Sequence, residues 1–277
     1  MSWCQKVLTA TSTAGALVAI IVVCRRLSKR GKPPSQFRVL VTGFNDWRNV
    51  ETRGVWTSDE NPSSRLIVGE ASDVPPIGRH GPLVKVLHGL SSCNPTLGNI
   101  EWSFMTLPTL WNVSSSLDYG FYDIVIHLGL GVYDNHTTIL VEDGAFNSCC
   151  AHPDASGRLP PKKQLAELHP SVLDSEGVTK RVLTSLKSPV DARETPLMPC
   201  NFRVEVAAAR PQNSYICNET NWRALSAVRE VGTGVNGRLR AAFFIHVPYA
   251  KDPKEYGPLA EAVAGVISHL AKGALED

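Results

Sequence analysis

Ala241-Ala-Phe-Phe-Ile-His-Val247 is an apolar run broken only by a histidine near its end, and Pro248 follows it directly. A short apolar run of this kind predicts a buried β-strand, because β-branched and aromatic residues favour strands. The run is continuous and does not alternate with polar residues, which indicates a strand covered on both faces. It therefore favours a sheet enclosed between layers of helices.

Two further runs extend this sheet. They are Phe37-Arg-Val-Leu-Val-Thr-Gly43 and Tyr122-Asp-Ile-Val-Ile-His-Leu128. Shorter strand candidates lie at 138–141 and 203–207. The spacing of apolar residues predicts amphipathic helices at 221–231 and 258–271. Strands that alternate with helices indicate a three-layer α/β domain.

Long polar stretches at 45–64, 90–100 and 152–200 are expected to be loops. The last of them is long enough for short helices at 162–168 and 178–186. No GxGxxG motif follows a predicted strand and no GxxxxGK loop is present, which argues against a nucleotide-binding domain.

Charge is unevenly distributed along the chain. The net charge is +2, from 28 basic and 26 acidic residues. Six basic residues and no acidic one lie in 1–32, so the rest of the chain is slightly acidic. A slightly acidic body argues against nucleic acid as a partner. The seven cysteines do not form paired CxxC motifs, so we expect no zinc site and no metal or other cofactor. Three glycosylation sequons, at Asn112, Asn135 and Asn218, have little weight because such short patterns arise by chance.

The N-terminal segment predicts a membrane anchor. Residues 7–24 are 18 residues without a charge, and a helix of that length spans about 27 Å. A strongly basic stretch and Pro33-Pro34 follow. By the positive-inside rule, we expect a single-pass anchor in 1–35 with the body, 36–277, in the cytosol. The endoplasmic reticulum and the mitochondrial outer membrane both suit such a span. An atypical signal or transit segment is the alternative.

Four side chains could support covalent chemistry. Cys217 directly precedes a predicted helix, whose N-terminal dipole would lower the pKa of its thiol and whose amides could bind an oxyanion. His246 ends the strand quoted first and could act as a base. His127 ends another strand and is an equal candidate on this reasoning. Glu142 follows the 138–141 strand and could orient an imidazole.

Together these segments resemble the pyroglutamyl-peptidase I family of cysteine peptidases, over roughly 37–272. The resemblance is carried by elements in the same order as in the family: Val39-Leu40-Val41-Thr42-Gly43-Phe44, Trp47, Asn61-Pro62-Ser63, His127-Leu128-Gly129-Leu130, Glu142 with Ala145 and Asn147, Pro153-Asp154 with Gly157, Tyr215-Ile216-Cys217-Asn218, and Phe244-Ile245-His246-Val247-Pro248. It implies an α/β/α sandwich around a mixed, mostly parallel twisted sheet.

The resemblance also implies roles for individual residues. Cys217 would be the nucleophile, His246 the base and then the acid, and Glu142 the orienting carboxylate. Phe44 and Trp47 would hold the flat lactam ring of an N-terminal pyroglutamyl peptide, which carries no charge to pair with. The resemblance selects His246 over His127 and leaves the assembly state open, a homo-oligomer included.

Three positions depart from the family's pattern. Ala151 stands where the family has an arginine linked to oxyanion stabilisation, and Pro211 and Asn213 stand where an aspartate and a glycine precede the nucleophile. These departures favour a second reading, in which the chain is a relative of low activity that binds N-terminally capped peptides at a membrane.

Overall fold

The structure is a computed structural model. It describes residues 36–45, 47–48, 55–56, 61–69, 80–131, 135–163, 165, 182–183, 202–207, 214–231, 238–250 and 252–276. Residues 37–277 form one compact unit. The expected anchor at 7–24 lies outside the described residues. None of the helices that the structure describes combines the length and the apolar character needed to cross a membrane.

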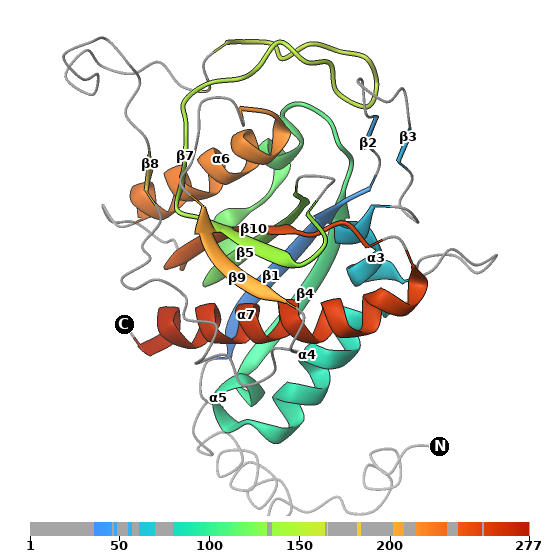
Figure 1. Ribbon diagram of the computed structural model, residues 1–277. Coiled ribbons are helices and arrows are strands. Elements are labelled where there is room, and N and C mark those ends of the chain that lie inside the picture. Colours follow the sequence, from blue (N-terminus) through green and yellow to red (C-terminus); the bar gives the residue numbers. More distant parts are fainter. Residues whose placement is uncertain are drawn as a thin grey trace, which may run out of the picture. The chain divides into compact units, whose positions relative to one another are not determined.

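A six-stranded sheet forms the centre of the compact unit (Figure 1). In spatial order its strands are β4 (Ile100–Leu107), β1 (Phe37–Phe44), β5 (Ile124–Leu130), β10 (Ala241–Val247), β6 (Thr138–Glu142) and β9 (Arg203–Ala207). Neighbouring strands are parallel except where β6 runs antiparallel to β10. The mixed, mostly parallel sheet is therefore confirmed. Two small ribbons pair β2 (Trp47–Arg48) with β3 (Val55–Trp56), and β7 (Gly144–Ala145) with β8 (Val182–Leu183).

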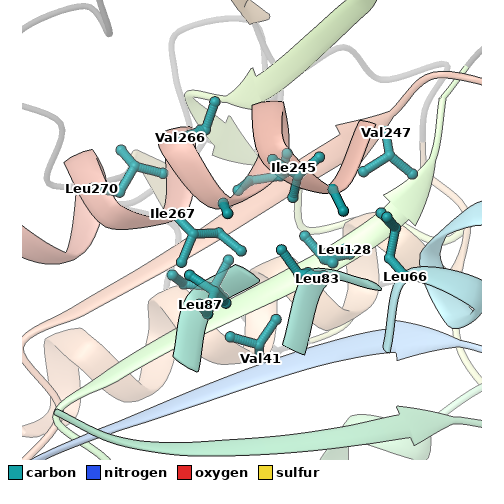
Figure 2. Close-up of a cluster of buried hydrophobic side chains, with 14 of the residues drawn as sticks. Val41, Leu66, Leu83, Leu87, Leu128, Ile245, Val247, Val266, Ile267 and Leu270 are labelled. Atoms are coloured by element: carbon teal, nitrogen blue, oxygen red, sulfur yellow. The ribbon is translucent and has the colours of Figure 1, made fainter. Parts of the chain in front are cut away.

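One face of the sheet is entirely apolar along its central strands. Successive side chains of a strand point to opposite faces, and on this face they are Val39, Val41, Ile124, Ile126, Leu128, Phe243, Ile245 and Val247. The helices that cover it are α3 (Pro62–Val68), α4 (Pro82–Cys93) and α7 (Tyr256–Glu276). Figure 2 shows Leu83, Leu87 and Ile267 of these helices among the strand side chains. Full burial of each such side chain contributes roughly 1.5–3 kcal/mol to folding.

The other face of the sheet carries polar and aromatic side chains. Thr42, His127, Phe244 and His246 alternate with the apolar residues just listed, so they point the opposite way. The helix α6 (Ile216–Val231) packs on this face, and its Ala224 and Leu225 contact Ala242 of β10. Figure 1 places α6 on the opposite side of the sheet from α7 and α4. The predicted three-layer arrangement is present, and the polar side chains of the central strands lie on the face that α6 covers.

The loop expected over 90–100 is wrong. The helix α4 continues to Cys93, α5 (Pro95–Gly98) follows, and β4 begins at Ile100. Asn94 makes this compact connection, since its side-chain oxygen accepts hydrogen bonds from the amides of Thr96 at 3.0 Å and Leu97 at 3.3 Å. An asparagine cap followed by a proline is a common start of a helix, but the same polar and proline-rich composition is also typical of loops.

The short helix expected over 178–186 is also wrong, because Val182–Leu183 is the strand β8. β8 pairs with β7, and this pairing with a distant segment overrides the local helical pattern. Most of the other short helix, expected over 162–168, lies outside the described residues. The C-terminal helix is confirmed and is longer than expected, as Tyr256–Glu276.

An ion pair with a buried carboxylate and a partly exposed guanidinium joins the start of β5 to the segment before β10. Asp123 accepts hydrogen bonds from the guanidinium of Arg238 at 3.2 Å and 2.9 Å, and from the amide of Arg38 at 2.8 Å. We expect Asp123→Ala to lower the free energy of unfolding by about 2 kcal/mol, because it removes these hydrogen bonds to a charged group and leaves the partly buried amide of Arg38 without this acceptor. Glu101→Ala is the control. It removes the exposed Arg38 pair at 3.5 Å and should cost less than about 1 kcal/mol. Urea unfolding of both variants measures the difference, and equal losses would contradict the prediction.

Candidate active site

His246 and Glu142 lie side by side on the polar face of the sheet. Nδ1 of His246 lies 3.3 Å from Oε1 of Glu142, and their side chains are only 13% and 9% exposed. The antiparallel pairing brings them together, since His246 is opposite Leu140, two residues before Glu142. A carboxylate at this distance favours a proton on Nδ1, which leaves the lone pair on Nε2. Among the described residues, Nε2 of His246 is buried and has no hydrogen-bond partner.

Cys217 reaches the same place from α6. The helix begins at Ile216, earlier than predicted, so Cys217 is its second residue. A β-carbon built on Gly129 would lie 3.1 Å from Sγ of Cys217. Gly129 is the direct β5 neighbour of His246, and adjacent strands are about 4.8 Å apart. The sulfur therefore lies over the strand position beside the histidine.

The expectation that Cys217 has a lowered pKa is wrong. Burial and the nearby charge of Glu142 raise the pKa of its thiol to about 12. Burial also lowers the pKa of His246 to about 4. Desolvation outweighs the helix dipole because Cys217 packs against an apolar and aromatic cluster. At neutral pH the resting site holds an uncharged thiol and an uncharged imidazole.

The first turn of α6 supplies amides that could face an oxyanion. Its first intrahelical hydrogen bond runs from the amide of Glu219 to the carbonyl of Tyr215, at 3.1 Å. The amides of Ile216, Cys217 and Asn218 precede that bond and have no partner within the helix. Donors at this position are the usual means of stabilising negative charge beside a nucleophile at a helix start.

Phe44 lies beside this site, at the end of β1. Its amide donates to Oγ of Ser63 at 3.0 Å, which fixes the strand end to α3. Its ring is buried in a cluster with Phe244 and Ile216, and Cys217 packs against that cluster. Trp47 contributes backbone to β2, and its side chain lies outside what the structure describes. The role of Trp47 therefore stays a prediction.

His127, the alternative base, has different surroundings. It is completely buried, and its Nδ1 lies 2.7 Å from Oγ1 of Thr42. Burial lowers the pKa of His127 to about 3. Its Nδ1 therefore has a hydroxyl neighbour, where that of His246 has a carboxylate. The geometry favours His246 as the base.

Trp111, which the sequence did not single out, connects the loop at 152–154 to Tyr215, two residues before Cys217. Its amide donates to Asp154 at 3.3 Å, its Nε1 donates to the carbonyl of His152 at 3.1 Å, and its ring lies edge-on to Tyr215. The hydroxyl of Tyr215 in turn donates to the carbonyl of Pro153 at 2.9 Å. Trp111 lies in an irregular stretch after β4, where no periodicity marks it.

Hydrogen bonds keep Asp154 ionised within this loop. Burial alone would raise its pKa, but donors from Ser156, Arg158 and Trp111 hold the pKa below its ordinary value. Ala151 is exposed beside the same loop and brings no cation. Pro211 and Asn213, the other departures, lie outside the described residues. Within the described part of the chain, no three His, Cys, Asp or Glu side chains are grouped to hold a metal ion.

Because the thiol of Cys217 is uncharged at neutral pH, its reaction with iodoacetamide should depend strongly on pH. Far below its pKa, the thiolate fraction of a thiol rises about tenfold per pH unit. We expect alkylation of Cys217, mapped by mass spectrometry, to accelerate steadily from pH 6 to pH 10. In the urea-unfolded chain, the same cysteine should level off near its ordinary pKa of about 8.5. A plateau below pH 7 in the folded protein would instead indicate a preformed thiolate.

Solved structures share this fold. The chain is similar to pyroglutamyl peptidase I of Bacillus amyloliquefaciens (16% identity, covering 83% of this chain and 97% of that one, TM-score 0.50). It is also similar to the pyrrolidone carboxyl peptidases of Pyrococcus furiosus (19%, covering 86% and 100%, TM-score 0.56) and of Fervidobacterium islandicum AW-1 (20%, covering 85% and 99%, TM-score 0.53). No protein-family model and no curated protein matches the sequence. The chain therefore has the fold of the pyroglutamyl peptidases, and at the level of the fold the resemblance carried by its motifs is confirmed.

Proposed function

We propose that this protein is a cysteine peptidase that hydrolyses the bond after an N-terminal pyroglutamyl residue. The observation that carries the proposal is the meeting of three side chains from separate elements. Glu142 lies 3.3 Å from His246, and the sulfur of Cys217 lies over Gly129, the strand neighbour of that histidine. The fold shared with pyroglutamyl peptidases supports the same conclusion.

The first half of the reaction forms an acyl-enzyme. Nε2 of His246 takes the proton of the Cys217 thiol while the sulfur attacks the pyroglutamyl carbonyl carbon. Glu142 stabilises the imidazolium that results, and the amides at the start of α6 receive the negative oxygen. His246 then gives its proton to the leaving amine. The C–N bond breaks, and a thioester remains on Cys217.

The second half releases the product. Nε2 of His246 takes a proton from water, and the hydroxide oxygen attacks the thioester carbonyl. The C–S bond breaks, the thiolate regains the proton and free pyroglutamate departs. Because both groups start uncharged, each proton transfer has to accompany attack, so the base acts only when a substrate is bound.

The lactam ring of the proposed substrate would suit the apolar and aromatic side chains beside Cys217. A lactam has no charge and two flat faces, so apolar and aromatic surfaces bind it without a counter-ion. Phe44 supplies such a surface beside Cys217. We propose that Trp47 supplies the second one. Phe44→Ala should then raise KM for a pyroglutamyl substrate more than it lowers kcat.

A fluorogenic assay tests the proposal. The full chain in detergent should release aminomethylcoumarin from its pyroglutamyl amide, and Cys217→Ser should not. The prolyl amide is the matched substrate control, since it has the same ring size with a charged amine in place of the lactam, and it should remain intact. Failure of folded wild-type protein to release the dye from the pyroglutamyl amide would refute the proposed activity.

One observation favours a second candidate function. Ala151 is exposed and brings no cation to the site. If the amides of α6 alone hold the oxyanion too weakly, the protein binds capped peptides without cleaving them. In that case pyroglutamyl peptides should raise the melting temperature while no amine is released. Turnover together with stabilisation would exclude this candidate.

We propose that residues 7–24 anchor the protein in a membrane, with the catalytic domain in the cytosol. The uncharged span and the basic stretch after it support this. A fluorescent reporter carrying residues 1–35 should stay in the membrane fraction after carbonate extraction. Its release into the supernatant would rule out a spanning anchor.

A further inference from the structure

The side chain next to the nucleophile makes an unusually complete set of hydrogen bonds. Oδ1 of Asn218 accepts the amide of Phe146 at 2.8 Å. Its Nδ2 donates to the carbonyl of Phe146 at 2.8 Å and to that of Ser148 at 3.0 Å. The residue is 9% exposed. Its amide thus pairs with the backbone as a neighbouring strand would.

The segment that Asn218 binds follows closely after the strand that carries the acid. Phe146 follows β7 and lies four residues after Glu142. A second bond, from the amide of Cys150 to the carbonyl of Ser214 at 2.8 Å, joins the same two stretches further along. The stretch 146–150 is therefore fastened to 214–218 at both ends, with Cys217 inside the fastened part.

We propose that Asn218 is a positioning residue that fixes Cys217 relative to the Glu142–His246 pair. The inference rests on the proposed function. Glu142 and His246 are held together by the sheet, whereas Cys217 arrives on a separate helix. Asn218 joins that helix, one residue from the nucleophile, to the chain that follows the acid. A displacement of about 1 Å between reacting groups can cost about 100-fold in rate.

The same helix offers a matched comparison. Asn221 is also buried, and its Nδ2 donates to the carbonyl of Gly144 at 3.1 Å. It therefore binds the same stretch of chain as Asn218, but it lies a turn further from Cys217. If these amides only dock the helix, replacing either residue should leave the reactivity of Cys217 in the folded protein unchanged. If Asn218 positions the nucleophile, replacing Asn218 should change that reactivity and replacing Asn221 should not.

The pairing also bears on the sequon at Asn218. Both hydrogens of its amide are donated to backbone carbonyls inside the protein. A glycan on Nδ2 would have to replace at least one of these bonds, so this sequon is not accessible to glycosylation in the folded chain.

Three variants test the proposal: Asn218→Ala, Asn218→Ser and Asn221→Ala. We expect Asn218→Ala to lower kcat for the pyroglutamyl amide about 100-fold with little change in KM. Asn218→Ser keeps a small hydrogen-bonding group and should fall between Asn218→Ala and wild type. Asn221→Ala removes a single hydrogen bond, so it should lower the melting temperature less and keep kcat within a few-fold of wild type. Equal losses of kcat in Asn218→Ala and Asn221→Ala, or a kcat of Asn218→Ala within a few-fold of wild type, would overturn the proposal.

A readout without turnover separates this proposal from the proposed function. The pH profile for iodoacetamide alkylation of Cys217 should shift in Asn218→Ala and Asn218→Ser and stay unchanged in Asn221→Ala. If the wild type cleaves no pyroglutamyl substrate, the proposed function fails, and the alkylation profile alone then tests the positioning role of Asn218. Identical profiles in the Asn218 and Asn221 variants would then overturn the positioning role. Should Asn218→Ala fail to fold, Asn218→Ser carries the same test.

Discussion

Alanine in place of either Cys217 or His246 is expected to lower kcat for a pyroglutamyl amide by about 10⁵-fold or more, and the double variant should lose scarcely more. The two side chains act as one unit, because the thiol is uncharged at rest and attacks only as its proton moves to Nε2. Glu142→Gln should cost less, about 10⁴-fold, since it keeps the shape of the contact with Nδ1 while losing the charge. Single-turnover kinetics on the three variants and the double variant measure the coupling.

His127 provides the control for this series. It lies in the middle of β5, the strand beside β10, and is also a buried histidine, but its Nδ1 faces the hydroxyl of Thr42. His127→Asn should lower the melting temperature and keep most of kcat in the protein that remains folded. A loss at His127 equal to that at His246 would mean that the base has been misassigned. Multiplying losses in the double variant would mean that Cys217 and His246 act separately.

Gly129→Ala is expected to lower activity strongly, although it replaces none of the reactive groups. The added methyl would lie 2.8 Å from two carbons of the Phe244 ring and 3.1 Å from Sγ of Cys217. Both contacts are too short, so the ring and the sulfur must move, and Phe244 is completely buried. A shift of the nucleophile should cost about 100-fold or more in kcat. The strain should also lower the free energy of unfolding by about 1–3 kcal/mol.

Gly89→Ala is the matched control for the added methyl. Gly89 lies on the exposed side of α4, and a β-carbon there meets nothing within 4 Å. Alanine favours a helix over glycine by roughly 1 kcal/mol, so this variant should be more stable and equally active. Steady-state kinetics and thermal melting of both variants make the comparison. Near wild-type kcat in Gly129→Ala would show that the site has more room than the structure gives it.

The central strands could be predicted because they are buried on both faces. The runs that contain Val39, Ile126 and Ile245 are continuous in apolar residues, and each is a strand of the sheet. β4 was missed because it lies at the sheet edge, where Trp102, Phe104 and Met105 remain partly exposed among polar residues. Edge strands need no continuous apolar run, so composition there resembles a loop.

The grouping of the candidate residues could be anticipated from the sequence, whereas their protonation states could not. The resemblance to the pyroglutamyl-peptidase I family singled out Glu142, Cys217 and His246 as candidates, and the structure brings these three side chains to one face of the sheet. The pKa of Cys217 was predicted with the wrong sign. A helix start is visible in sequence, whereas desolvation depends on how Ile216 and Phe244 pack around the sulfur. The bonds of Asn218 to Phe146 were equally invisible, because they join segments 72 residues apart.

The change of strand direction between β10 and β6 decides where the carboxylate of Glu142 lies. β5 and β10 run in the same direction, so Gly129 and His246 come near the ends of their strands at a common edge. β6 runs the other way, and its last residue, Glu142, lies level with Phe244, further inside the sheet than His246. The carboxylate therefore reaches the imidazole from a position further inside the sheet. In the proposed reaction, the negative charge of Glu142 is thus set back from the strand ends, and the uncharged thiol and imidazole lie between it and the peptide bond to be cut.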